Sequence, residues 1–217
     1  AIAGTTALVA IKSASRGKTS SIPSGIEVSE IQGVQVVKGG KEGPNIIFLH
    51  NAGQVPLGMT EHIKNLSEAG QVIAPNIFDL IRSLQLRGNK NPSFADIANE
   101  ISRLDLLDKR QKTGLVTTSF GSSVAWEYTA QHPNEVEWNV AGSPTGWPLK
   151  RSLIEWIAAF AREFILPPEV PIPENIRKRD PGSGLMMERA RKHPESVLQG
   201  LKLSMEVDQR ETMREIK

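Results

Sequence analysis

The spacing of apolar residues changes several times along the chain, and each change predicts a new element. Short β-branched runs with a glycine-containing break predict a hairpin over residues 26–40. The stretch NIIFLHNAG (45–53) is continuously apolar before a glycine-containing loop, which is typical of a strand buried on both faces. Residues 71–80, QVIAPNIFDL, form a further apolar run.

Helical spacing separates these runs. The segment TEHIKNLSEAG (60–70) predicts a short helix, with Thr60 and Gly70 as its start and stop residues. A second helix is predicted from Ser93, which is suited to cap it, by apolar residues at helical spacing: Phe94, Ile97, Ala98, Ile101 and Leu104.

The following segments continue the alternation. A buried strand is predicted over TGLVTTS (113–119), a helix over residues 121–133, and one more strand over VEWNVAGSP (136–144). Strands that alternate with helices predict the α/β class, with a doubly wound, mostly parallel sheet and helices on both faces.

Composition limits the function classes. The chain has 217 residues, of which 39% are hydrophobic, enough for a substantial core. Its 26 basic and 24 acidic residues give a net charge of +2, and the basic residues are scattered, so we expect no nucleic-acid partner. The absence of cysteine excludes a disulfide framework, a thiolate zinc site and a cysteine nucleophile.

The amino-terminal stretch AIAGTTALVAI is apolar and is followed by Lys12, Arg16 and Lys18. It is too short to span a bilayer, which needs roughly 20 residues. Residues 1–25 are therefore interpreted either as the remnant of a trimmed anchor or signal segment, or as a plain tail or edge strand. The two alternatives correspond to a membrane-associated and a cytoplasmic protein.

The stretch LVTTSFGSS (115–123) is the main candidate for chemistry. Ser119 stands between a predicted buried strand and a predicted helix, the arrangement of a nucleophile elbow. The tight turn of an elbow requires small residues two positions before and two after the serine, and these are Thr117 and Gly121. Gly121 fits, whereas Thr117 is bulkier than the usual glycine. The alternative is that Ser119 is one more hydroxyl in a Ser/Thr-rich loop.

Several segments in order resemble the α/β-hydrolase superfamily over residues 26–217. IIFLHNAG (46–53) is similar to that family's third strand and oxyanion loop, and VIAPNIFDLIRS (72–83) to the segment that follows. Residues 93–146 are similar to the helix, nucleophile strand, elbow helix and sixth strand. The resemblance implies that Ser119 is the nucleophile, that the backbone N–H groups of Phe120 and Ala52 form the oxyanion hole, and that neither a metal nor a cofactor is needed.

The resemblance also narrows the substrate. Dehalogenases and epoxide hydrolases of this fold have Asp at the elbow, whereas position 119 is Ser. A carboxylic ester or related acyl compound is the small-molecule substrate that it implies.

The chain departs from the family pattern in several places. Asn51 stands where the family usually has Gly, and Asn76 where it usually has Asp. The strands that carry the acid and histidine of the triad would follow Lys217, so the resemblance implies that a C-terminal part is missing, and that further sequence or a partner chain supplies these groups. We interpret the chain's own histidines as structural (His50), surface (His62), a solvent-facing helix cap (His132) and part of a cap region (His193).

The predicted organisation is a hydrolase core over residues 26–146, a helical cap over 147–205 and a return segment over 206–217. An apolar stripe of Ile157, Phe160, Ala161 and Phe164 supports the cap. Two functions remain open: a serine hydrolase whose chain is incomplete, or a non-catalytic binding or assembly subunit that keeps the fold.

Overall fold

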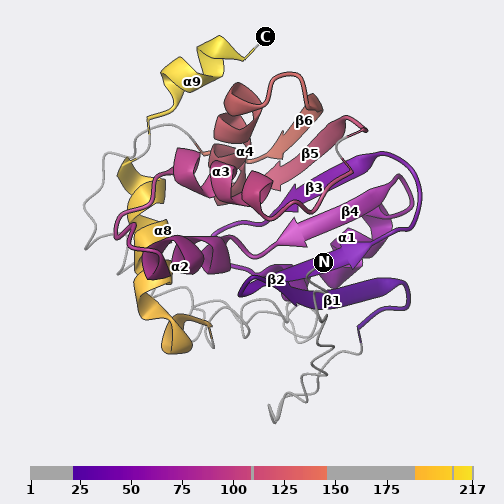
Figure 1. The fold of residues 1–217 in the computed structure, drawn as a ribbon, viewed down its shortest axis with the longest axis horizontal. Coiled ribbons are helices and arrows are strands. Elements are labelled where there is room, and N and C mark those ends of the chain that lie inside the picture. Colours follow the sequence, from indigo (N-terminus) through magenta and orange to yellow (C-terminus); the bar gives the residue numbers. More distant parts are fainter. Residues whose placement is uncertain (1–21, 109, 146–188, 207, 217) are drawn as a thin grey trace, which may run out of the picture.

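Within the described part of the chain, a six-stranded sheet forms the centre (Figure 1). The computed structural model describes residues 22–108, 110–145, 189–206 and 208–216. The strand order is β1-β2-β4-β3-β5-β6. The strands are β1 (Ile26–Ile31), β2 (Val34–Gly39), β3 (Asn45–Leu49), β4 (Gln71–Pro75), β5 (Thr113–Thr118) and β6 (Val136–Gly142).

The sheet is mostly parallel, as predicted. Strand β3 pairs in parallel with β4 and β5, and β5 pairs in parallel with β6. The hairpin β1–β2 adds two antiparallel strands at one side, and it turns at Gln32 and Gly33. Both turn residues have positive φ, 52° and 81°, which matches the two-residue turns that suit the twist of a hairpin.

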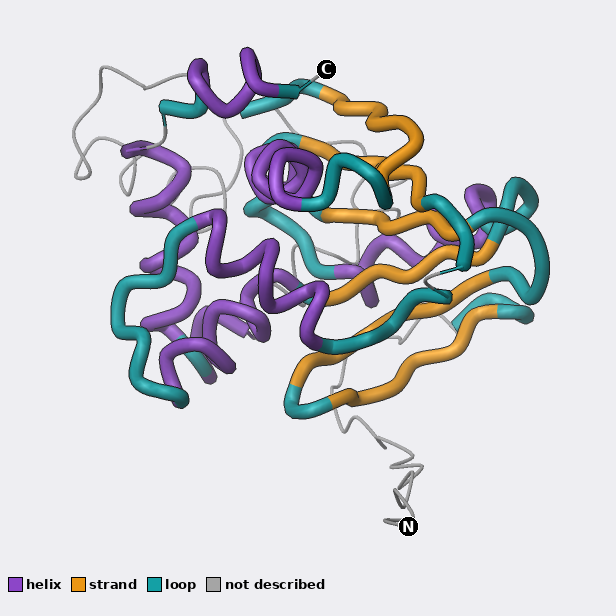
Figure 2. Tube along the Cα trace, turned by 45° about the horizontal axis from the view of Figure 1, so that its top comes forward, coloured by secondary structure: helices purple, strands orange, loops and turns teal. Residues whose placement is uncertain are grey.

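Helices cover both faces of the sheet (Figures 1 and 2). Helix α1 packs on one face, and α2, α3, α4 and α8 pack on the other. The helical elements are η1 (Pro56–Met59), α1 (Thr60–Leu66), α2 (Ile77–Leu86), α3 (Phe94–Arg103), α4 (Phe120–Gln131), α8 (Pro194–Glu206) and α9 (Arg210–Glu215).

Strand β3 contributes side chains to the apolar clusters on both faces of the sheet. All five of its residues are buried. Ile46 and Phe48 belong to the cluster beneath α1, whereas Ile47 and Leu49 belong to the larger cluster beneath α2, α3 and α4. Side chains alternate across a strand, so a continuously apolar run is what a strand covered on both faces requires.

Two sequence-based boundaries need correction. The apolar run 71–80 is not one element, because it divides at Asn76 into strand β4 and helix α2. Helix α1 ends at Leu66 rather than at Gly70, and no side chain caps its start. A Cβ on Gly70 would lie 2.3 Å from the carbonyl oxygen of Pro44, so this glycine permits close backbone contact with the turn before β3.

The predicted cap at Ser93 is confirmed. The Ser93 hydroxyl accepts a hydrogen bond from the Asp96 N–H at 3.1 Å, and the Asp96 carboxylate accepts one from the Ser93 N–H at 2.7 Å. This reciprocal capping box satisfies two amides at the start of α3.

The last two described helices pack on the core layer. Helix α8 contacts α2, and its Val197 and Leu201 enter the larger apolar cluster. The Gln209 side chain, just before α9, donates to the carbonyl oxygen of Ser123 at 2.8 Å and so fastens α9 to α4. Residues 1–21 of the predicted tail (1–25) and the predicted apolar stripe of the cap lie outside the described residues.

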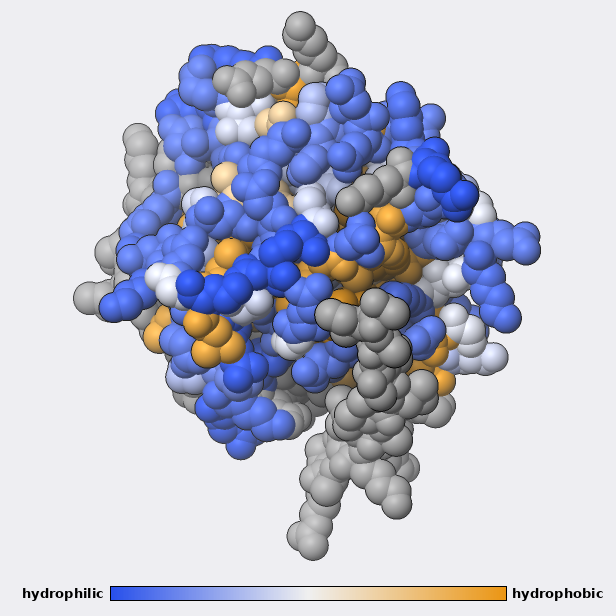
Figure 3. Space-filling model, viewed as in Figure 1, coloured by the Kyte–Doolittle hydropathy of each residue, from blue (hydrophilic) through white to orange (hydrophobic). Residues whose placement is uncertain are grey.

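Most of the described surface in this view is hydrophilic, with smaller apolar areas between the polar ones (Figure 3). None of the described helices has the length and apolar character that crossing a membrane requires.

Candidate active site

Ser119 occupies a strained turn between β5 and α4. Its backbone angles are φ 48° and ψ −118°, a region that residues with a side chain rarely adopt. Three hydrogen bonds hold this conformation. The Ser119 N–H donates to the carbonyl oxygen of Gly142 at 3.0 Å, and the Ser119 carbonyl oxygen accepts from the Ser122 N–H at 2.9 Å and from the Thr145 hydroxyl at 3.0 Å.

Small side chains allow the turn to fit against the sheet. A Cβ on Gly121 would lie 2.3 Å from the carbonyl oxygen of Leu49, so α4 can approach β3 this closely only with glycine there. Thr117, the bulkier residue on the other side, is buried, and its hydroxyl lies 3.1 Å from the Ser122 hydroxyl. A threonine is therefore accommodated under the turn because its polar group has a partner.

Thr145 also holds this turn, although the sequence predictions did not include it. Besides its bond to the Ser119 carbonyl oxygen, its hydroxyl lies 2.6 Å from that of Ser123. Thr145 follows β6, which is parallel to β5. Because the carboxyl ends of parallel strands meet at one edge of a sheet, the position of Thr145 after the next strand was the signal that could have identified it.

His50 is a structural residue, as predicted. Its ring is buried, its Nδ1 lies 2.8 Å from the Asn51 carbonyl oxygen, and its Nε2 accepts from the Ile77 N–H at 2.9 Å. These contacts place the proton on Nδ1. Burial lowers the pKa of His50 to about 4, so the ring is neutral near pH 7. Both ring nitrogens are engaged in the hydrogen bonds just described.

Asn51 and Asn76 shape the two loops that follow β3 and β4. The Asn51 Oδ1 accepts from the Gly53 N–H at 2.7 Å, so the side chain closes a turn around Ala52, the predicted second oxyanion residue. Ala52 is half-buried and packs against the larger apolar cluster. Asn76 caps α2 by accepting from the Phe78 N–H at 3.1 Å, a role that Asp at this position would also fill.

Aromatic rings connect these loops to the turn at Ser119. The His50 ring lies 5.6 Å from that of Phe78, which stacks on Phe120 at 6.0 Å with an interplanar angle of 5°. Phe120 also meets Phe94 at 5.2 Å. Because Phe120 directly follows Ser119 and is fully buried, this packing fixes the start of α4.

The other histidines lie elsewhere. His62 is exposed, and His193 is half-buried beside α2, where burial and the charges of Arg82 and Arg189 lower its pKa. His132 is the C-cap of α4 but is only 20% exposed, and its Nε2 lies 2.8 Å from the Ser102 hydroxyl, so the predicted solvent-facing position is wrong. Within the described ranges, no hydrogen bond joins a histidine to the Ser119 hydroxyl.

Two searches, one with family models and one of curated protein sequences, gave no match. Solved structures do resemble the chain. A membrane phospholipase A described as a bacterial virulence factor matches with a TM-score of 0.56 and 15% identity over 88% of this chain and 66% of its own. An epoxide hydrolase matches with a TM-score of 0.55 and 16% identity over 87% and 75%.

A putative lipase from Acinetobacter baumannii matches with a TM-score of 0.54 and 16% identity, over 82% of this chain and 66% of its own. The chain thus spans slightly less than two thirds of the length of the phospholipase and of the lipase. Together with the sheet order and the turn at Ser119, these likenesses show that the chain has the α/β-hydrolase fold, as the sequence predicted.

Proposed function

We propose that the chain is the nucleophile-bearing part of a serine hydrolase that acts on carboxylic esters or related acyl substrates. The observation that carries this proposal is the backbone of Ser119, at φ 48° and ψ −118° between a buried strand and a helix. Functional sites often hold a residue with a side chain in a strained backbone conformation that glycine would adopt without strain. Ser at the elbow, rather than Asp, supports acyl transfer.

In the proposed reaction, the Ser119 hydroxyl oxygen forms a bond to the acyl carbon and its proton passes to a base. The N–H groups of Phe120 and Ala52 would stabilise the oxyanion of the tetrahedral intermediate. The proton then passes to the leaving alkoxide, which departs as an alcohol. Water releases the acid and restores the serine. This chemistry needs neither a metal nor a cofactor.

The base is not His50, because both of its ring nitrogens are engaged and it resists protonation near pH 7. We propose that the histidine and the acid come from further sequence or from another chain, since the four histidines of these 217 residues all lie in the described ranges and none is hydrogen-bonded to the Ser119 hydroxyl. A serine hydroxyl without such a base is a weak nucleophile.

The second candidate is a non-catalytic binding or assembly subunit. It is favoured by the surroundings of Ser119, where the described hydrogen bonds fix the backbone and none activates the hydroxyl. In this alternative the strained turn would be a structural remnant.

Labelling with a fluorophosphonate ester distinguishes the two candidates. An activated serine reacts far faster than an ordinary hydroxyl. We expect slow or no labelling of the 217-residue chain, and labelling at Ser119 when a longer chain or a partner supplies a histidine and an acid. The adduct would be located by mass spectrometry, and Ser119→Ala should abolish it.

Ser143→Ala is a matched control, because Ser143 is an exposed serine that also has positive φ, 46°. This variant should label as the unaltered chain does. Absence of labelling both in the 217-residue chain and in a longer chain or complex that supplies a histidine and an acid would favour the non-catalytic subunit. Rapid labelling of the 217-residue chain would show that a base lies within it.

A further inference from the structure

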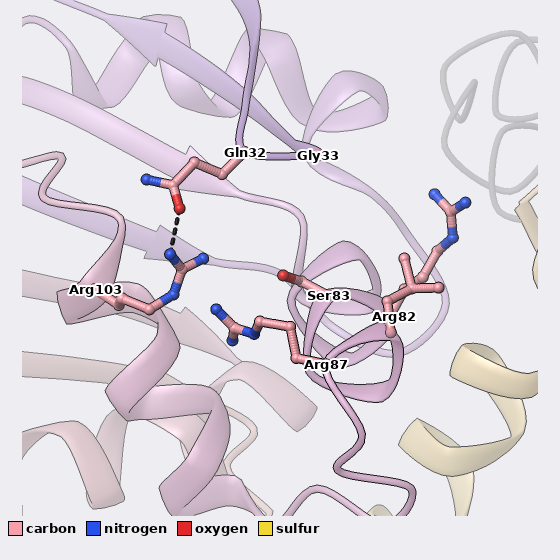
Figure 4. Close-up of a pocket in the computed structure, with 7 residues that line it drawn as sticks. Gln32, Gly33, Arg82, Ser83, Arg87 and Arg103 are labelled. Atoms are coloured by element: carbon pink, nitrogen blue, oxygen red, sulfur yellow. Dashed lines mark hydrogen bonds between the residues drawn. The ribbon is translucent and has the colours of Figure 1, made fainter. Parts of the chain in front are cut away.

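A pocket of about 280 Å³ lies between the β1–β2 turn and the last turns of α2 and α3 (Figure 4). Three of its seven lining residues are arginines. The lining residues are Gln32, Gly33, Arg82, Ser83, Leu86, Arg87 and Arg103. None of them contributes to the turn at Ser119 or to the loop after His50, so the pocket is separate from the candidate active site.

A buried carboxylate lies beneath the pocket. The Glu100 side chain is 2% exposed and forms ion pairs with Arg87 and Arg103. Arg103 binds it with two nitrogens, Nε at 2.8 Å and Nη2 at 2.7 Å, and the Ser83 hydroxyl donates at 3.0 Å. Burial raises the pKa of Glu100, but these hydrogen bonds outweigh it and hold the pKa below its ordinary value. Glu100 is therefore a carboxylate with two cationic partners.

The arginines keep donors for a further ligand. Their side chains are 43% (Arg87) and 40% (Arg103) exposed. A guanidinium has five N–H donors. Within the described part of the chain, Arg87 uses one donor on Glu100, while Arg103 uses two on Glu100 and one on the Gln32 side chain.

Among the described residues, the charge balance at the pocket is positive. Two guanidinium groups face one carboxylate, and Arg82 brings a third cation to the wall, with its guanidinium directed away from the other two (Figure 4). The carboxyl ends of α2 and α3 contribute partial negative charge that stabilises arginines there. Two carbonyl oxygens at the end of α2 are already satisfied, because those of Gln85 and Leu84 accept hydrogen bonds from the N–H groups of Gly88 and Asn89.

We propose that this pocket binds a phosphate-type oxyanion between the guanidinium groups of Arg87 and Arg103. The Glu100 carboxylate takes donors from both arginines, and each guanidinium keeps further donors. A tetrahedral phosphate, with more acceptor oxygens and more negative charge than a carboxylate, can accept these remaining donors from two groups that come from different helices. The Ser83 hydroxyl donates to Glu100, so the two arginines supply the donors. The phosphate can belong to a small soluble compound or to a lipid headgroup.

Inorganic phosphate is the first probe, with the whole chain in calorimetric titration and in thermal unfolding. We expect saturable binding and a rise in melting temperature beyond that given by chloride at matched ionic strength. Arg87→Gln should weaken phosphate binding about tenfold or more, because one charge-assisted fork is lost. This variant should fold, because Arg103 and Ser83 still bind Glu100. Arg87→Lys, which keeps the charge but not the fork, should be intermediate.

Arg110→Gln is the matched control. Arg110 is also an exposed arginine paired with a carboxylate, Asp108 at 2.8 Å, but it does not line the pocket. Its removal should leave phosphate binding unchanged. Equal losses in Arg87→Gln and Arg110→Gln would overturn the proposal, since the effect would then reflect net charge alone.

Vesicles distinguish the two sources of phosphate. Arg87-dependent binding to vesicles that contain phosphatidic acid, and not to phosphatidylcholine vesicles, would assign the pocket to a lipid headgroup. Binding of inorganic phosphate without vesicle binding would assign it to a soluble compound. If phosphate acts no differently from chloride and neither type of vesicle binds in an Arg87-dependent way, the proposal is wrong.

Discussion

Gly121 touches the backbone of β3 at Leu49, where a Cβ would lie 2.3 Å from the carbonyl oxygen. Because that oxygen belongs to a buried strand, the strand or the helix must shift to admit a methyl group. We expect Gly121→Ala to lower the free energy of unfolding by about 1–3 kcal/mol, the usual range for overpacking. Urea denaturation measures this loss.

Gly142→Ala provides the control for Gly121→Ala, since a Cβ on Gly142 would meet its nearest neighbour, the Thr117 carbonyl oxygen, at an ordinary 3.6 Å. We expect a change within about 0.5 kcal/mol in that variant. Equal losses in the two variants would show that the contact with Leu49 is not the cause.

The strain at Ser119 predicts an unusual order of stabilities. Alanine keeps the Cβ at φ 48°, whereas glycine removes it. Relief of strain is worth about 1–3 kcal/mol, and the greater freedom of unfolded glycine offsets up to about 1 kcal/mol. Ser119→Gly should therefore unfold at higher urea than Ser119→Ala. The opposite order would mean that the turn imposes no strain on residue 119.

His50 predicts a loss of stability in acid. Its folded pKa of about 4 lies below the ordinary 6.5, so between these values the unfolded chain binds a proton that the folded chain does not. The contribution of this pKa difference to the free energy of unfolding is complete above pH 6.5. As the pH falls toward 4 this contribution is lost, which lowers the free energy of unfolding by about 3 kcal/mol. Unfolding free energies measured from pH 8 to 4 should fall more steeply for His62→Gln, a control at an exposed histidine, than for His50→Gln. Parallel curves would refute this account.

Asp79 and Arg189 form an ion pair that joins α2 to the segment before α8, and both side chains are largely buried. Desolvation raises the pKa of Asp79, and Arg189 opposes this rise. Arg189→Gln should lower stability by about 3–5 kcal/mol near pH 7, because it leaves a buried carboxylate without its cation. The double variant Asp79→Asn/Arg189→Gln should recover much of that loss. Additive losses in the double-mutant cycle would show that the two residues are not coupled.

The outer edge of β6 has no strand partner among the described residues, and Val140 on it is 60% exposed. Such edges pair readily with other chains. We expect the isolated chain to self-associate and to bind hydrophobic dyes, and Val140→Lys to reduce both effects. Leu86→Lys is the control, because Leu86 is 75% exposed but lies on a helix. Light scattering that shows a monodisperse monomer would contradict this expectation.

Local patterns were sufficient to predict most of the elements, because their signals lie within a few residues. The N-cap at Ser93 and the glycine at position 121 are of this kind. Gly70 shows the limit: the sequence contains a glycine after a helix, but not the carbonyl oxygen of Pro44 that requires it. The same limit applies to Glu100, because its partners Arg87 and Ser83 lie on another helix, so helical spacing alone gives no indication that a glutamate is buried there.

Gly200 in α8 lies against the ring of Phe78, where a Cβ would come within 2.8 Å of the ring edge. Phe78 in turn stacks on Phe120, the neighbour of Ser119. A methyl group at position 200 would therefore displace the Phe78 ring toward Phe120, the first residue of α4. Gly200→Ala should thus change the packing at the start of α4 from a distance, without any contact to Ser119 itself.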